Sequence, residues 1–392
     1  MKFEDNDISS STESVSITND LIKHKISMKH HCLVLDLHSF HQYIPNFLYR
    51  ILCWIGLFKE AKDILRSRIT SNVFKLILIF VNVDNWSIIL NGIDPTHMVL
   101  SLTHISTYAL ASGAWYAMYS KRRRFSKLMI KFQKLPLTIN EKKSFFLIIM
   151  ISCIPIVLPM ITIVANYENF NLFTYGYEIN NPWVAFLVVG IKFFLYTFVF
   201  PTLTNVIALL YCIMCRHTSK FINHLSLDIA RCSPRNFIIS KQIQKIKEMT
   251  HVEEILEAMQ DIFSVPTFLI IISNLSTCAN MLSMYLTETN NNALSYIEWT
   301  LYTLNCLACV ITIVLFAEGV TTEECRFKDA FHKKSKLRML LIAGPEEPRL
   351  GRWLLDKPDF VFTGWNILPY KRDTVFVVVG TLISYTALMA NK

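Results

Sequence analysis

Residues 183–214 read WVAFLVVGIKFFLYTFVFPTLTNVIALLYCIM and form the longest apolar stretch of this 392-residue chain, with Lys192 as its only charged residue. About 20 apolar residues in a helix cross the roughly 30 Å of hydrocarbon in a bilayer, because each residue advances the helix by about 1.5 Å. The stretch therefore predicts a transmembrane helix.

Six further stretches have the same character. The composition agrees, with 52% hydrophobic and only 18% charged residues. We therefore predict an all-α membrane protein with seven transmembrane helices, of which the other six are Val73–Ile93, Met98–Met118, Ser144–Asn166, Phe263–Leu286, Trp299–Ala317 and Thr374–Ala390.

The distribution of Lys and Arg predicts the orientation of these helices. Nine Lys and Arg residues precede the first span. The six loops that follow contain 0, 9, 0, 7, 0 and 11 of them in chain order, and Lys392 follows the last span. Positive residues collect on the cytoplasmic side, so we expect a cytoplasmic N-terminus and an extracellular C-terminus in the plasma membrane. A G-protein-coupled receptor has seven spans in the opposite orientation and is a poor fit.

Acidic residues occupy the three outer loops, which contain no Lys or Arg. A negative potential at the outer face would enrich cations there. The sequence predicts this potential from Asp94, Glu168, Glu178, Glu288 and Glu298.

The cytoplasmic segments are longer than connectors need to be. Residues 1–40 begin with a polar, Ser/Thr-rich run and predict a disordered cytosolic tail ahead of a seven-helix domain over 41–392. Between Ser240 and Ile262, apolar residues recur every three or four positions, which indicates an amphipathic helix. We expect 215–262 and 318–373 to form a helical anchor layer, with Leu337–Ala343 and 360–362 covering that helix; solvated loops are the alternative.

Several other classes of function lack support in the sequence. The net charge of +9 lies on one face of the membrane, where clusters such as Lys121–Arg124 meet anionic lipid head groups rather than nucleic acid. Cys306-x-x-Cys309 falls within a span and indicates helix packing, while His30, His31 and Cys32 with His38 and His41 are irregularly spaced. We expect no metal, no cofactor and no enzymatic activity, since no Gly-rich phosphate loop or His-Glu-x-x-His motif occurs.

Two charges lie inside predicted spans. Asp84 is about nine residues from the outer end of span one and Lys192 about nine from the outer end of span four, so both lie roughly 13 Å deep. Buried charges usually find partners, so we expect the two to pair. The alternative is that Lys192 extends to the interface while Asp84 faces water or a hydroxyl.

The last span has polar residues on one face, at positions 374, 381 and 385. A ring of such helices would form a pore lined by Thr381 and Tyr385, and Val378 and Leu382 could gate it by dewetting. The alternative is a packed helix whose hydroxyl groups bond back to the backbone.

Aromatic and polar residues occur together in the outer halves of spans two to six. Apolar walls with a few polar groups are typical of small-molecule sites, although interhelical contacts use the same residues. The candidate ligand-binding residues are His104, Tyr108, Phe194, Tyr196, Asn274, Asn280, Trp299 and Tyr302.

The end of the chain resembles a known family. Residues 362–376 read FTGWNILPYKRDTVF and lead into the last span, which ends in Ser384-Tyr385, five further residues and Asn391-Lys392. This arrangement is similar to the C-terminal motif of arthropod gustatory receptors, in which Thr-Tyr, five residues and Gln-Phe close the pore helix. Tyr385 and the spacing match, whereas Ser384, Asn391 and Lys392 differ from the motif.

The resemblance implies a ligand-gated, non-selective cation channel built as a homo- or hetero-tetramer. The last helix of each subunit, 374–390, would line the pore up to Asn391, and a small organic tastant would bind among spans two to six. A secondary transporter using Asp84 or Lys192 for coupling is the alternative, although the sequence shows no internal repeat.

The predicted orientation can be tested with epitope tags. A tag after Lys392 should label in intact cells and a tag before Met1 only after permeabilisation, because the basic loops hold the N-terminus inside. Immunofluorescence with and without detergent measures both, and the reverse pattern would restore the G-protein-coupled interpretation.

Overall fold

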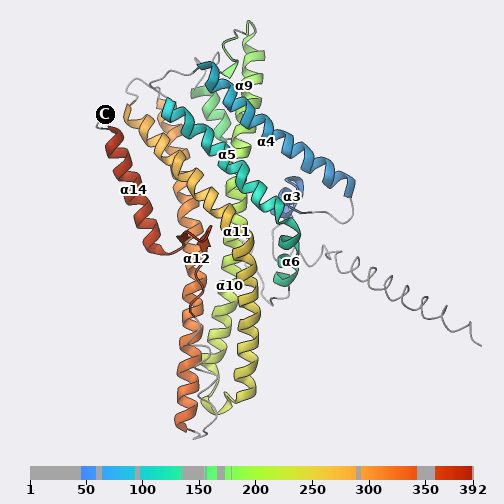
Figure 1. Cartoon of the computed structure of the whole chain (residues 1–392), viewed down its shortest axis with the longest axis vertical. Helices are drawn as coiled ribbons and strands as arrows, with labels where there is room; N and C mark the ends of the chain where they lie inside the picture. Colours follow the sequence, from blue (N-terminus) through green and yellow to red (C-terminus); the bar gives the residue numbers. More distant parts are fainter. Residues whose placement is uncertain are drawn as a thin grey trace, which may run out of the picture.

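The computed structural model describes residues 46–58, 64–92, 98–133, 135, 154, 157–165, 173–177, 179–287, 293–341 and 358–390. This part of the chain is almost entirely helical, with one short hairpin (Figure 1). Its elements are α3 (Asn46–Trp54), α4 (Ile64–Gly92), α5 (Met98–Ser120), α6 (Arg122–Gln133), α9 (Pro182–Thr197), η3 (Phe198–Leu203), α10 (Thr204–Arg231), η4 (Pro234–Asn236), α11 (Ile239–Thr287), α12 (Ala293–Leu341), β1 (Thr363–Gly364), β2 (Leu368–Pro369) and α14 (Arg372–Ala390).

Three helical stretches of the described residues are long and apolar enough to cross a membrane: Pro182–Arg231, Ile239–Leu286 and Ala293–Leu341. They contain the predicted fourth, fifth and sixth spans. The predicted first, second and seventh spans coincide with α4, α5 and α14. Of the predicted third span, the structure describes residue 154 and the helical residues 157–165.

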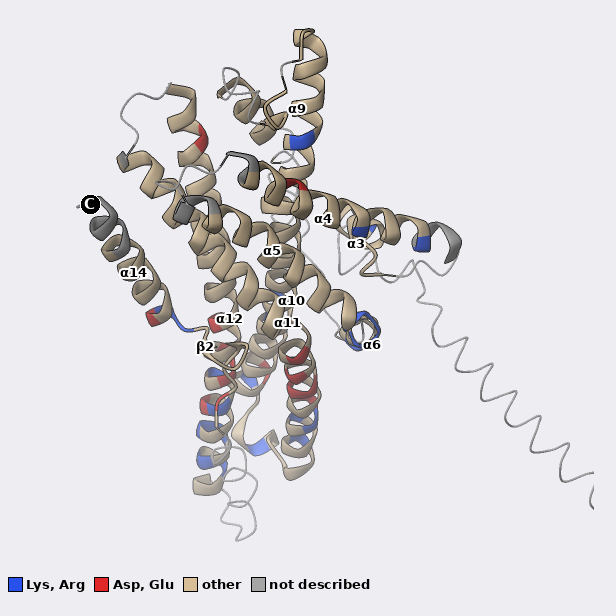
Figure 2. Cartoon of the chain, turned by 45° about the horizontal axis from the view of Figure 1, so that its top comes forward, with Lys and Arg blue, Asp and Glu red and all other residues tan. Residues whose placement is uncertain are grey.

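Charged residues gather at one end of the molecule (Figure 2). Lys, Arg, Asp and Glu are concentrated on the lower parts of α10, α11 and α12 and on α6, whereas the upper parts of the helices carry few of them. The long helices therefore combine an apolar half with a charged half, as helices do when they cross a membrane and continue into water.

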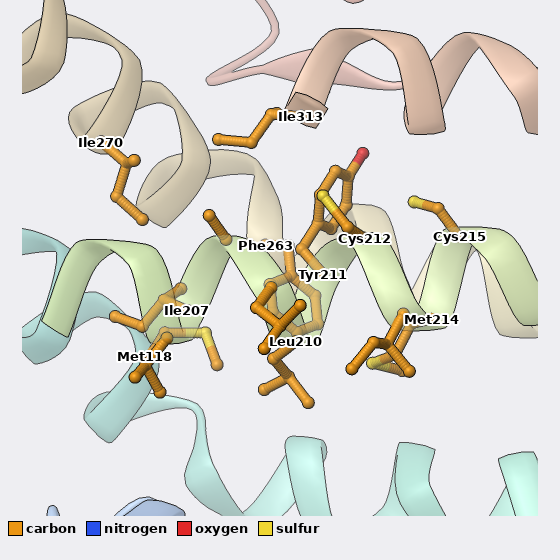
Figure 3. Packing of buried hydrophobic residues seen from close by; sticks show 14 of the residues in the cluster. Met118, Ile207, Leu210, Tyr211, Cys212, Met214, Cys215, Phe263, Ile270 and Ile313 are labelled. Carbon is orange, nitrogen blue, oxygen red and sulfur yellow. The ribbon is translucent and has the colours of Figure 1, made fainter. Parts of the chain in front are cut away.

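Helix α10 forms the centre of the apolar core. Every residue from 201 to 215 is buried. In Figure 3, Leu210, Tyr211 and Cys212 of α10 lie among side chains from other helices, including Phe263 of α11 and Ile313 of α12. A helix that is apolar on all sides is stable only when neighbours surround it, so α10 organises the packing of the others.

The path from α9 to α10 is interrupted at η3. Phe200 has the extended backbone angles φ −143° and ψ 125°, and Pro201 follows it. The ring of proline disfavours the helical conformation in the residue before it. The long apolar stretch at 183–214 is therefore two helices joined by a break rather than one continuous helix.

The predicted amphipathic helix is the first half of α11, which continues without interruption through Pro266. Its stripe is buried, with Met249, Val252, Ile255, Leu256 and Met259 no more than 1% exposed. In the described part of the predicted cover at 337–343, Leu340 and Leu341 do not cover α11, since they are 74% and 61% exposed. Instead α6, α10 and α12 pack against α11.

The segment before the first long helix is packed into the core. Leu57 and Phe58 are 1% exposed, and the Phe58 ring lies 4.7 Å from that of Phe125 of α6. Gly56 turns the chain with φ +79°, and a Cβ at this position would collide with Ser71 of α4. Glycine is therefore required where the chain turns back against α4.

Residues 359–371 are fastened to α11 on one side. Gln260 donates from Nε2 to the Thr363 carbonyl at 2.9 Å and accepts the Thr363 backbone N–H at 3.1 Å. Ser264 Oγ donates to the same carbonyl at 2.9 Å, and the hydroxyls of Thr267 and Tyr370 are 2.7 Å apart. The hairpin of β1 and β2 lies within this segment.

The same segment is fastened to α12 on its other side. Lys328 Nζ lies 3.2 Å from Glu324 Oε1 and 2.8 Å from Asp359 Oδ1, and Glu324 Oε2 accepts the Phe360 backbone N–H at 3.2 Å. Burial raises the pKa of the Glu324 carboxyl, and the charge of Lys328 opposes that rise. The hydrogen bond from Lys328 lowers the pKa of Asp359. The charges thus compensate one another, with Glu324 and Lys328 buried and Asp359 at the exposed edge of the group.

Helix α14 starts directly after this segment and stands at the side of the bundle (Figure 1). It packs against α11 and α12, and the partly buried Val375 and Leu382 meet the core. Its other faces are open, with Phe376, Val377 and Ile383 65% to 75% exposed.

Candidate functional site

The two charges inside the predicted spans lie together. Lys192 Nζ of α9 is 2.9 Å from Asp84 Oδ1 of α4, and the two residues are 9% and 3% exposed. Helix α9 begins at Pro182, and Asn181 caps it by accepting the Trp183 backbone N–H at 3.0 Å. The cap and the proline fix the start of α9 and thereby the position of Lys192 along it.

Asp84 and Lys192 also have neutral partners. The hydroxyls of Tyr175 and Tyr196 both donate to the Asp84 carboxylate. Lys192 donates to the Phe173 carbonyl at 2.9 Å, and its Nζ lies 4.1 Å from the centroid of the Tyr175 ring. The buried charges therefore have the hydrogen bonds that make such a pair tolerable in a low-dielectric environment.

Sequence reasoning missed Tyr175 and Phe173. Both lie in a predicted outer loop, where an aromatic residue carries no signal for contact with a buried carboxylate. The turn geometry brings Tyr175 back, since Tyr175 and Gly176 have φ values of 57° and 83°. Gly176 allows this reversal because glycine adopts positive φ without a steric penalty.

An aromatic cluster extends from the ion pair into the bundle. The Tyr108 ring of α5 lies 5.7 Å from Tyr196, 5.2 Å from His104 and 6.3 Å from Phe200, all in tilted or edge-on arrangements. These three predicted residues, His104, Tyr108 and Tyr196, thus form one group. Rings with polar tips can bind an apolar molecule and orient it through a few hydrogen bonds.

Glu298 is not in an outer loop, so its assignment to the outer mouth is wrong. It belongs to α12, is 9% exposed and accepts a hydrogen bond from Thr162 Oγ1 at 2.6 Å. Helix α12 begins at Ala293, five residues before Glu298, so the helical turn directs its side chain into the bundle. The predicted Tyr302 lies one turn further along the same helix. The other four outer acids lie outside the described residues.

The remaining predicted ligand residues lie in other places. Phe194 is 45% exposed and stacks on Phe198, which contacts Trp54 and Phe74. Trp299 packs edge-on against Tyr296 at 5.3 Å, near the start of α12.

Two asparagines of α11 are buried with incomplete hydrogen bonding. Asn274 is fully buried and donates to the Ile270 carbonyl at 2.8 Å, while its Oδ1 has no hydrogen-bond partner among the described residues. Asn280 is 7% exposed, and its Oδ1 also has no partner in that part of the chain. A buried amide oxygen without a hydrogen bond destabilises the folded state unless a further donor reaches it. A ligand could supply that donor, so both residues stay candidates for ligand contact.

The predicted pore residues lie on α14. Thr381 donates to the Val377 carbonyl at 2.8 Å and Ser384 to the Gly380 carbonyl at 2.9 Å, the local bonds expected of hydroxyls in an apolar helix. Thr381 is exposed, Val378 partly buried, and Leu382 packs against the core. The side chain of Tyr385 and all of Asn391 lie outside the described residues.

No metal site emerges among the residues that the structure describes, where no group of three His, Cys, Asp or Glu side chains could hold an ion. Cys306 and Cys309 are buried in α12 as free thiols. The histidines near the N-terminus lie outside the described part of the chain.

A double-mutant cycle tests the coupling of α4 to α9. We expect Asp84→Asn and Lys192→Met each to lower the free energy of unfolding by about 3 kcal/mol, because each leaves one buried charge without its partner. Surface expression should fall with it. The double mutant should recover at least about 1 kcal/mol of the summed loss. The exposed pair Lys131 and Glu254, 2.8 Å apart, is the control, and its cycle should change stability by less than about 1 kcal/mol. Strictly additive losses at Asp84 and Lys192 would contradict the coupling.

Comparison with known proteins identifies the architecture. No model of a protein family matches the sequence, and no protein of curated function matches it. Among solved structures, the insect olfactory receptor OR5 from Machilis hrabei superimposes with a TM-score of 0.71 at 10% sequence identity, over 88% of this chain and 97% of that receptor. The same receptor in complex with eugenol gives a TM-score of 0.67 at 10% identity, over 90% and 99% of the two chains. The chain is therefore similar in fold to an insect olfactory receptor over 88% of its length.

Proposed function

We propose that this protein is a chemosensory receptor that acts as a ligand-gated, non-selective cation channel in the plasma membrane. The observation that carries the proposal is the similarity in fold to OR5, which spans 97% of that receptor rather than one shared domain. The C-terminal motif at 362–376 and Tyr385 favours the gustatory branch. The ligand is then a small organic tastant.

The ligand is expected near the aromatic cluster around Tyr108. OR5 has been solved in complex with eugenol, a small organic molecule. In this chain, His104, Tyr108 and Tyr196 supply aromatic walls, and the polar groups of Glu298 and Thr162 lie on neighbouring helices. This chemistry suits a compact ligand that is mostly apolar and has at least one hydrogen-bond donor for the carboxylate.

The pore is expected between four copies of the chain. Helix α14 leaves most of its apolar surface uncovered, which in a tetramer would face lipid, the pore and neighbouring subunits. The stripe at 374, 381 and 385 would line the passage, with Val378 as an apolar constriction. The exposed residues Leu337, Leu340 and Leu341 of α12 would then be part of the contact between subunits in the anchor layer.

The mechanism couples α12 to α14. Glu298 and Tyr302 place the beginning of α12 near the proposed ligand, and Glu324 and Lys328 of the same helix hold the segment that precedes α14. Glu318 Oε2 also lies 2.9 Å from Arg372 Nε, at the first residue of α14. A ligand that shifts α12 would therefore move the start of the pore helix, provided that it binds the open state more tightly.

The functional test is electrical recording. The chain, expressed in cells without native chemoreceptors, is exposed to a panel of small organic compounds under patch clamp. Unitary currents that begin with ligand addition and reverse near the cation equilibrium potentials are the expected result. Saturable flux driven by an ion gradient would instead favour a secondary transporter.

The outer acids give a quantitative prediction about permeation. Neutralising Asp94, Glu168, Glu178 and Glu288 together should reduce unitary conductance about twofold at low salt and little at physiological salt, since screening weakens a surface potential. Glu298→Gln, which removes a buried charge, should instead change the ligand concentration needed for activation without this salt dependence. A reversal potential that follows chloride would contradict cation conduction.

A further inference from the structure

Two cations meet on one aromatic ring where α5 ends. Lys75 Nζ of α4 lies 4.5 Å from the centroid of the Tyr119 ring, and the guanidinium carbon of Arg122 lies 4.4 Å from it. Tyr119 is in the last turn of α5, and Arg122 is the first residue of α6. The ring attracts each cation, but it does not neutralise either charge.

Three other basic residues of this region already have acidic partners. Lys121 and Arg124 both pair with Asp261 of α11, and Lys131 pairs with Glu254. Lys75 and Arg122 have no carboxylate within ion-pair distance in the described part of the chain. The first turn of α6 also contains no acid, although the N-terminal end of a helix favours negative charge. The Tyr119 ring thus has two positive charges next to it, and no carboxylate of the described residues pairs with either.

The surface next to this site is apolar and exposed. On α4, Leu76, Ile79 and Phe80 are 65%, 60% and 46% exposed, and they follow Lys75 within about one and a half turns. On α5, Tyr116 is 67% exposed and precedes Tyr119 by one turn. A free phosphate would use only the cations, whereas a phospholipid would also cover these side chains.

We propose that Lys75, Tyr119 and Arg122 form a binding site for an anionic phospholipid of the cytoplasmic leaflet. The lipid phosphate sits between the ammonium of Lys75 and the guanidinium of Arg122, and its acyl chains lie along the exposed apolar side of α4. The site joins the beginning of α4 to the α5–α6 turn. It goes beyond the proposed channel function and rests only on the membrane embedding of α4 and α5 that is part of that proposal.

Lipid binding can be measured without any current. The purified full-length protein in phosphatidylcholine nanodiscs is titrated with a fluorescent phosphatidylglycerol. Lys75→Gln and Arg122→Gln should each weaken binding about fivefold, and together about 25-fold, since each removes one cation at the membrane surface. Tyr119→Leu leaves the net charge unchanged and should also weaken binding, because the ring that holds both cations is lost.

Two controls make the test specific. The pair Arg123→Gln and Lys127→Gln removes the same charge from exposed positions of α6 and should change the affinity less than about threefold. The charge-conserving pair Lys75→Arg and Arg122→Lys should retain most of the binding, which separates loss of charge from misfolding.

Three results would overturn the site. If the control double variant lost as much affinity for the lipid as the Lys75 and Arg122 double variant, the binding would be due to the general positive charge of the surface. Competition by soluble glycerol 3-phosphate at the concentration where the lipid binds would mean that the ligand is free phosphate. An unchanged affinity in all variants would mean that the lipid binds elsewhere. Since none of these readouts depends on gating, failure of this site and failure of the channel assignment are distinguishable.

Discussion

The burial of the first part of α10, residues 204–215, on all sides is the constraint on which the rest of this structure depends. A helix with no polar face has no stable place at a surface in water, and it needs neighbouring helices or lipid around it. Here the neighbours are α5, α11 and α12, whose side chains meet those of α10 in the centre of the bundle (Figure 3). The positions of the ligand candidates and of the segment before α14 follow, because both are built on helices packed around α10.

The charged side chains Asp84 and Lys192 of the apolar half are buried and paired, whereas those of the charged half are largely exposed. In the apolar half, Asp84 and Lys192 are fully paired, and their partners come from α4, α9 and residues 173–177. In the charged half, pairs such as Lys131 and Glu254 are exposed and contribute little stability. Loss of one partner is therefore tolerable on α6 but costly beside Asp84, and this makes the apolar half the more sensitive to substitution.

The segment at 359–371 connects the two halves to α14. It is held by hydrogen bonds to Gln260 and Ser264 of α11 and by the charged group of Glu324, Lys328 and Asp359 on the side of α12. A segment tied to two long helices follows their relative displacement rather than moving by itself. If the proposed ligand site lies at the beginning of α12, a displacement of α12 would reach α14 through this segment, without any contact between the ligand and α14.

The membrane class, the positions of most long helices and the segregation of Lys and Arg follow from the sequence, because hydropathy and charge depend on composition along a single helix. The meeting of Asp84 and Lys192 also follows, because a constant rise per residue puts both at a similar distance from the ends of their predicted spans. Three features required the tertiary structure: the break at Phe200 and Pro201 inside one apolar stretch, the burial of Glu298, and the return of Tyr175 to Asp84. Each depends on which face of a helix meets another element, or on how a turn is closed. Those contacts are set by the packing of distant segments, which no local pattern of residues encodes.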